Sequence, residues 1–144
     1  MAEFTFETNW AGGSGAIDRS QQLSSAVAAA AHTLAASVAQ DAGGAETPGS
    51  VSEHVVSLRE AAADLAVVFE NLAGQIADME RRNILISVRE EGAQVRRTAE
   101  SVAALHAAAA GAHELAALVA NAQEPLLDLA LTDEAESVVW ERYE

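Results

Sequence analysis

Apolar residues between Val51 and Met79 follow the spacing of a helix that packs along one line. They recur at alternating intervals of four and three residues: Val51, Val55, Leu58, Ala62, Leu65, Phe69, Leu72, Ile76 and Met79. This spacing keeps the side chains in one stripe, which favours packing against other helices. The pattern predicts a long helix that opens at Ser50 or Ser52, and Ser50 with Glu53 has the spacing of a capping box.

An earlier helix is predicted over residues 16–41. Its apolar positions also fit heptad spacing: Leu23, Val27, Leu34 and Val38. Gly43-Gly44 should end it, and residues 43–50, with Pro48-Gly49, form a loop long enough to reverse the chain. Residues 1–15 read as a separate flexible arm, with a short strand-like alternation followed by a glycine-rich turn.

After Met79 the apolar stripe loses its spacing, and two interpretations are open. The helix either continues to about Ala122 with a shifted stripe, or breaks near Asn83 and restarts at Ser87, which has capping-box spacing to Glu90. The lack of Pro and Gly between Gly74 and Gly92 favours continuity. The β-branched residues of Ile84-Leu85-Ile86 favour a break.

The next predicted helix is rich in alanine and ends over residues 121–125. Its stripe comprises Val95, Val102, Leu105, Ala109, Ala112, Ala116 and Val119. An acidic segment, 124–144, follows, and a short helix is predicted from Asp133.

The predicted fold is all-α: an antiparallel bundle of two or three long helices over 16–123, with a short C-terminal helix. The expected core consists of Leu23, Val27, Leu34, Val38, Val55, Leu58, Leu65, Phe69, Leu72, Ile76, Val102 and Leu105.

Composition suggests a thin core that needs a partner. Alanine supplies 34 of the 144 residues and aromatic residues only 4%. Alanine favours helix but buries little area. We therefore expect association with a protein partner or a second copy through Val55 to Met79.

Charge and hydropathy narrow the choice of partners. The net charge is −14 and all eight basic residues are arginine, so nucleic acid and anionic lipid are poor partners. Apolar runs are interrupted before about 18 residues, which predicts no membrane span. Without a basic start typical of a Sec signal peptide, we expect a cytoplasmic protein, or one exported without such a signal.

No catalytic, metal or cofactor motif is recognisable, so we expect a protein that is not an enzyme and has no cofactor. His106 and His113 lie one heptad apart, which is too far for one metal's ligand pair. Arg82, Arg89 and Arg96 form a stripe at heptad spacing. It is either a solvated charged face or a docking site for the acidic C-terminal segment or a partner.

Partner binding is predicted at two places. One is the long helix, through Leu65, Phe69, Leu72 and Ile76. The other is the set of aromatic residues outside the long helices: Trp10, Trp140 and Tyr143. Tryptophan carries much of the energy at protein interfaces. The alternative is that Trp140 folds back onto the chain's own core.

Trp10-Ala11-Gly12 is a Trp-x-Gly tripeptide in a small, acidic, alanine-rich helical chain without cysteine. This combination resembles the WXG-type helical-hairpin proteins of type VII secretion. In that family the tripeptide lies in the turn between two helices, whereas here it precedes the first predicted helix. The resemblance implies a non-catalytic partner or chaperone that pairs into four-helix bundles. A ligand-binding or sensory bundle, with aromatic residues and His106 or His113 around a pocket, is the other hypothesis.

Overall fold

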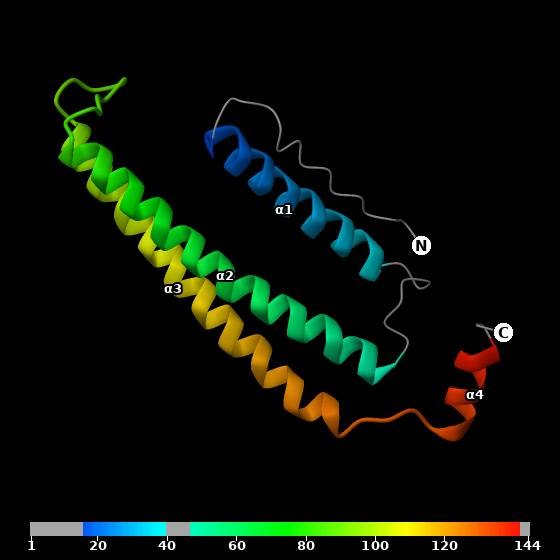
Figure 1. The fold of residues 1–144 in the computed structure, drawn as a ribbon. Coiled ribbons are helices and arrows are strands. Elements are labelled where there is room, and N and C mark those ends of the chain that lie inside the picture. Colours follow the sequence, from blue (N-terminus) through cyan, green and yellow to red (C-terminus); the bar gives the residue numbers. More distant parts are fainter. Residues whose placement is uncertain (1–15, 40–46, 142–144) are drawn as a thin grey trace. The chain divides into compact units, whose positions relative to one another are not determined.

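The computed structural model describes residues 16–39 and 47–141 and confirms an all-α fold. Four helices follow one another: α1 (Ala16–Ala39), α2 (Pro48–Arg81), α3 (Gln94–Leu127) and α4 (Asp133–Glu141) (Figure 1). The described ranges contain no strand. The chain divides into two units, residues 1–46 and 47–144. The predicted arm at residues 1–15 lies outside the described residues.

The first unit contributes α1. This helix covers the predicted range 16–41 as far as the described residues extend. Of its expected core residues, Leu34 is half-buried, whereas Leu23, Val27 and Val38 are exposed.

The start of α2 is fixed by a capping box, one turn earlier than predicted. The Thr47 hydroxyl accepts a hydrogen bond from the Ser50 backbone N–H at 3.1 Å, and the Ser50 hydroxyl accepts one from the Thr47 N–H at 3.2 Å. Pro48 follows at the first helical position, where its missing N–H costs nothing. The predicted start at Ser50 or Ser52, with a box from Ser50 to Glu53, is therefore wrong.

The helix breaks at Asn83, which resolves the two interpretations of this region. Asn83 adopts a left-handed conformation, with φ 54°. Its N–H donates to the Glu80 carbonyl at 2.9 Å, and the Ile84 N–H donates to the Met79 carbonyl at 3.3 Å. These two bonds are those of a Schellman C-cap, and asparagine tolerates its left-handed position better than most residues.

The chain does not restart its helix at Ser87 as predicted. The Ser87 hydroxyl accepts a hydrogen bond from the Glu90 N–H at 3.2 Å, but this closes a single turn. Gly92 then takes a left-handed φ of 78°, and α3 begins at Gln94. We call residues 82–93 the tip loop. At the other end, α3 runs to Leu127 with Pro125 inside its last turn, two residues beyond the predicted limit.

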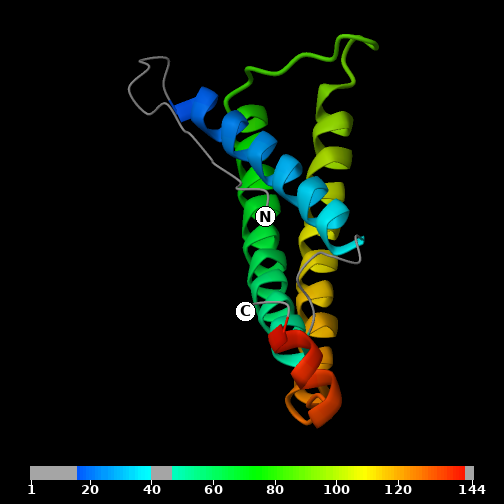
Figure 2. The same ribbon diagram turned by 90° about the vertical axis from the view of Figure 1, so that its right-hand side faces the viewer.

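Helices α2 and α3 form an antiparallel hairpin and lie side by side in both views (Figures 1 and 2). Two contacts fix their relative position. The Arg59 guanidinium donates to the Gln123 amide oxygen at 3.0 Å, and Nδ1 of His106 lies 2.9 Å from a Glu70 carboxylate oxygen. The positions in α2 rise as those in α3 fall, as an antiparallel pair requires.

Small residues form the contact line between these two helices. Ala66 and Ala73 of α2 and Ala109 of α3 are fully buried, and Ala62 is nearly so. Alanine lets two helix backbones approach closely, which leaves little room for larger side chains between them. We call this line of buried alanines the seam.

The predicted core of large side chains is therefore wrong. None of its members belongs to the buried set, and Leu58 and Leu72 are exposed. The stripe predicted for α3 is closer to the structure. Its members from Val102 to Val119 are half-buried or buried, and Val95 at the start of the helix is the exposed exception.

Candidate partner-binding surface

The seam leaves the large apolar side chains of α2 to one side of the contact with α3. Leu58, Leu65 and Leu72 follow one another at heptad spacing, so they share one face of the helix. Leu58 is 45% exposed and Leu72 is 41% exposed, while Leu65 is half-buried. A stripe that would fill the core of a larger bundle is therefore only partly covered.

The bond between Glu70 and His106 shows which sides of the two helices belong together. Both side chains leave the seam on the same side of the hairpin, because they meet at 2.9 Å. Helical spacing puts Leu65 and Leu72 on the side of α2 away from Glu70. It likewise puts Leu115 on the side of α3 away from His106. These leucines consequently share one side of the hairpin.

We call this side the apolar flank. It consists of Leu58, Leu65, Leu72 and Ile76 of α2 with Leu115 of α3, which is exposed; Leu118, also exposed, borders it on the outward face of α3. Its charge is low. The spacing of α2 directs its carboxylates up to Asp78 to the opposite flank or to the outward face: Glu53, Glu60, Asp64, Glu70 and Asp78. Along α2 this side thus carries no carboxylate up to Asp78, whereas in α3 helical spacing directs the Arg97–Glu100 ion pair to it, near the tip loop.

The structure places four of the predicted partner-binding residues in or beside this flank. Leu72 is exposed, and Leu65, Phe69 and Ile76 are half-buried, with Phe69 between the flank and the seam. Trp140 lies on α4 and is 63% exposed. Trp10 and Tyr143 lie outside the described residues. The structure therefore groups the α2 residues and leaves Trp140 on a different element.

Helix α4 presents its tryptophan next to carboxylates. The Thr132 hydroxyl accepts a hydrogen bond from the Ala135 N–H at 3.4 Å and so caps the helix. Asp133, Glu134 and Glu136 occupy the first turn, where the helix dipole favours negative charge. The Trp140 Nε1–H reaches a Glu136 carboxylate oxygen at 3.4 Å, one turn away. The indole ring is thereby held on the helix surface.

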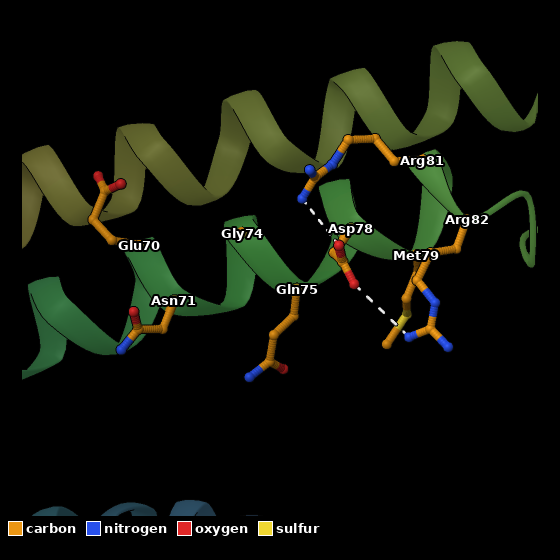
Figure 3. Close-up of a pocket in the computed structure, with 8 residues that line it drawn as sticks. All are labelled: Glu70, Asn71, Gly74, Gln75, Asp78, Met79, Arg81 and Arg82. Atoms are coloured by element: carbon orange, nitrogen blue, oxygen red, sulfur yellow. Dashed lines mark hydrogen bonds and ion pairs between the residues drawn. The ribbon is translucent and has the colours of Figure 1, made fainter.

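The polar side of α2 carries a shallow hollow near its C-terminal end. Its volume is about 580 Å³. Seven of its lining residues come from α2 and the eighth, Arg82, is the first residue of the tip loop: Glu70, Asn71, Gly74, Gln75, Asp78, Met79, Arg81 and Arg82 (Figure 3). Asp78 lies between two arginines, 3.0 Å from Arg81 and 3.8 Å from Arg82. One carboxylate thus offsets part of the charge that could attract an anion. The ligand-binding hypothesis requires His106 or His113 and aromatic residues around a pocket. None of these lines the hollow.

Sequence reasoning did not identify the tip loop as a surface. Ile86 is 83% exposed and Val88 is 89% exposed, and Ile84 is exposed as well. A second hollow, of about 590 Å³, is lined by residues of this loop and by Gln94. The alternation of β-branched residues at 84, 86 and 88 was the signal.

Helix α3 is, by length and composition alone, apolar enough to cross a membrane. The prediction of no membrane span had rested on interruptions of the apolar runs. His106, His113 and Glu114 do interrupt α3, but its alanine content keeps the hydropathy high. The absence of a span therefore stays a prediction.

Comparisons of the chain with protein-family profiles, with curated proteins and with solved structures found no match. The resemblance to WXG-type proteins accordingly stays a prediction.

Proposed function

We propose that this chain is a non-catalytic helical interaction protein, and that the apolar flank of its α2–α3 hairpin binds helices of a partner protein or of a second copy. One observation carries the proposal. Three leucines of the flank, Leu58, Leu72 and Leu115, are exposed on a side of the hairpin where α2 carries no carboxylate up to Asp78. A contiguous apolar surface of this kind is typical of protein–protein contacts.

The geometry of the flank suits helices better than an irregular peptide. Leu58, Leu65 and Leu72 repeat every seven residues, so they offer a straight row of knobs to another helix. Pairing two hairpins along this row would produce a four-helix bundle. This is also the arrangement that the resemblance to type VII secretion proteins implies.

A pair of variants tests the proposal. Leu72→Glu/Leu115→Glu puts charge on both helices of the flank, whereas Val67→Glu puts it on the other side of α2 at a residue of similar exposure (54%). We expect the double variant to weaken association at least ~10-fold, because a desolvated carboxylate is costly at a packed contact. Val67→Glu should associate like the parent. Sedimentation equilibrium measures association, and circular dichroism checks that helicity is unchanged.

Two results would count against the proposal. One is that the purified chain sediments as a strict monomer and Leu65→Glu leaves its stability unchanged. The other is that Val67→Glu weakens association as much as the double variant, since this would place the contact on the polar side.

A further inference from the structure

The two ends of the α2–α3 hairpin carry complementary features. At one end the tip loop exposes Ile84, Ile86 and Val88, and the loop also holds two arginines and two glutamates. At the other end the chain continues into 124–141, the C-terminal segment, whose Val138 and Trp140 are exposed among carboxylates. Each end combines apolar side chains with a different charge balance.

The charge difference between the ends is large. Residues 80–100 contain five arginines and four glutamates, a net charge of +1 in a chain of net charge −14. Residues 124–144 contain seven acidic side chains and one arginine, Arg142: Glu124, Asp128, Asp133, Glu134, Glu136, Glu141 and Glu144. Arg89 has no ion-pair partner among the described residues, whereas the other four arginines of the loop end each pair with a carboxylate. Its charge is available to another surface.

The backbone of the tip loop is also available. Within the described chain the N–H groups of Leu85, Ile86 and Val88 donate to no protein acceptor. Hydrogen bonds nevertheless hold the loop at its start, by the Schellman cap at Asn83, and over its second half, by the turn at Ser87 and the bond from the Ala93 N–H to the Glu90 carbonyl at 3.2 Å. An ordered, apolar loop with unpaired backbone groups is suited to docking, because little entropy is lost when it binds.

The two ends cannot meet within one chain. Helix α3 has 34 residues, so it separates them by ~51 Å at 1.5 Å per residue. Residues 128–132, fully extended, and the nine residues of α4 reach only ~30 Å from the end of α3. Trp140 therefore falls ~20 Å short of the tip loop of its own hairpin.

We infer that the tip loop of one molecule docks on the C-terminal segment of a second copy, so that the chain associates head to tail. Ile86 and Val88 pack against the Trp140 side of α4, where Glu136 also lies, and Arg89 faces its carboxylates. A contact between two different surfaces leaves one of each unoccupied, so association continues into a chain or closes into a ring. This contact is separate from the apolar flank and does not depend on the proposed function.

Complementation between two variants tests the inference. The loop variant is Ile86→Ser/Val88→Ser and the tail variant is Trp140→Ala. Both are made in the Leu72→Glu/Leu115→Glu background, which removes association through the flank, and also in the otherwise unchanged chain. Val67→Ser is the matched control, since it removes an exposed apolar side chain elsewhere on α2.

In sedimentation velocity, the Leu72→Glu/Leu115→Glu parent should associate more as its concentration rises. It should associate less at high salt, because salt screens exposed charges. The loop variant and the tail variant, each measured alone, should stay monomeric at concentrations at which the parent associates. We expect the affinity of self-association to fall at least ~10-fold. An equimolar mixture of the two should form a dimer and nothing larger, because only one intact loop and one intact tail remain per pair. Val67→Ser should behave like the parent.

Three outcomes would overturn the inference. The parent background could remain monomeric at every concentration. The tail variant alone could still dimerise, which would indicate loop-to-loop contact. Finally, the loop variant could lose binding to phosphatidylserine vesicles while no variant changes self-association, which would assign the loop to a membrane surface.

Discussion

The seam and the apolar flank lie next to each other on α2 and use side chains of opposite size. The seam consists of alanines that are almost or completely buried, whereas the flank carries leucines that are partly exposed. In most cores the large residues are inside because they gain most from burial. Here the smallest ones are inside, since only they allow α2 and α3 to approach closely. The largest residues are thus left for contacts beyond the hairpin.

The largest effect should come from enlarging a seam residue. Ala73→Leu inserts three carbons at a fully buried position of the seam, and we expect it to lower the free energy of unfolding by about 2–3 kcal/mol. Ala61→Leu, at an exposed position of the same helix, should change it by less than about 0.5 kcal/mol. Urea unfolding followed by circular dichroism measures both. Equal effects would show that the seam is not tightly packed.

A smaller effect should come from truncating a flank residue. Leu72→Ala removes a side chain that is 41% exposed, so only part of its transfer free energy is lost and we expect about 1 kcal/mol for the isolated chain. The same substitution should weaken association more than it weakens folding. If it destabilises the monomer more than Ala73→Leu does, the assignment of seam and flank is reversed.

The smallest effect concerns the polar side. The Glu70–His106 contact joins the two helices but both side chains are about half exposed, at 49% and 53%. A double-mutant cycle with Glu70→Ala and His106→Ala should give a coupling energy of about 0.5 kcal/mol, as for other exposed pairs. The same cycle on Arg97 and Glu100, within α3, serves as the control. A coupling above about 2 kcal/mol would make this contact more important than the seam.

Helix content was predictable from the sequence because it depends on local spacing. The 4-3 stripe of α3 was also predicted almost completely, since its alanines and valines are narrow enough to lie inside the contact. In α2 the stripe was placed correctly on one side, but Ala66 and Ala73 were missed. Periodicity shows which residues share a face of a helix. It does not show which edge of a broad apolar face will be covered when only one helix packs against it.

The candidate surfaces were predictable only in part. Leu65 and Leu72 could be named from their spacing, but whether they are exposed depends on how many helices cover them. Glu70 and His106 are 36 residues apart in sequence. Their contact depends on how α2 and α3 are aligned, which no local pattern encodes. The break at the tip loop could be anticipated, but its exposure depends on the left-handed conformations of Asn83 and Gly92, which no local pattern specifies.

The tip loop also bears on how the hairpin folds. It joins two helices whose contacting residues are farther apart in sequence the farther they lie from the loop. The separation is 36 residues for Glu70–His106 and 64 residues for Arg59–Gln123. Closing short loops costs less entropy than closing long ones, so pairing next to the tip loop comes first and each later contact closes only a small additional segment. We expect the hairpin to form as a zipper from the tip loop and to open from its far end. In hydrogen exchange, the amides near Ala73 and Leu105 would then be protected longest, and those near Arg59 and Gln123 would exchange first.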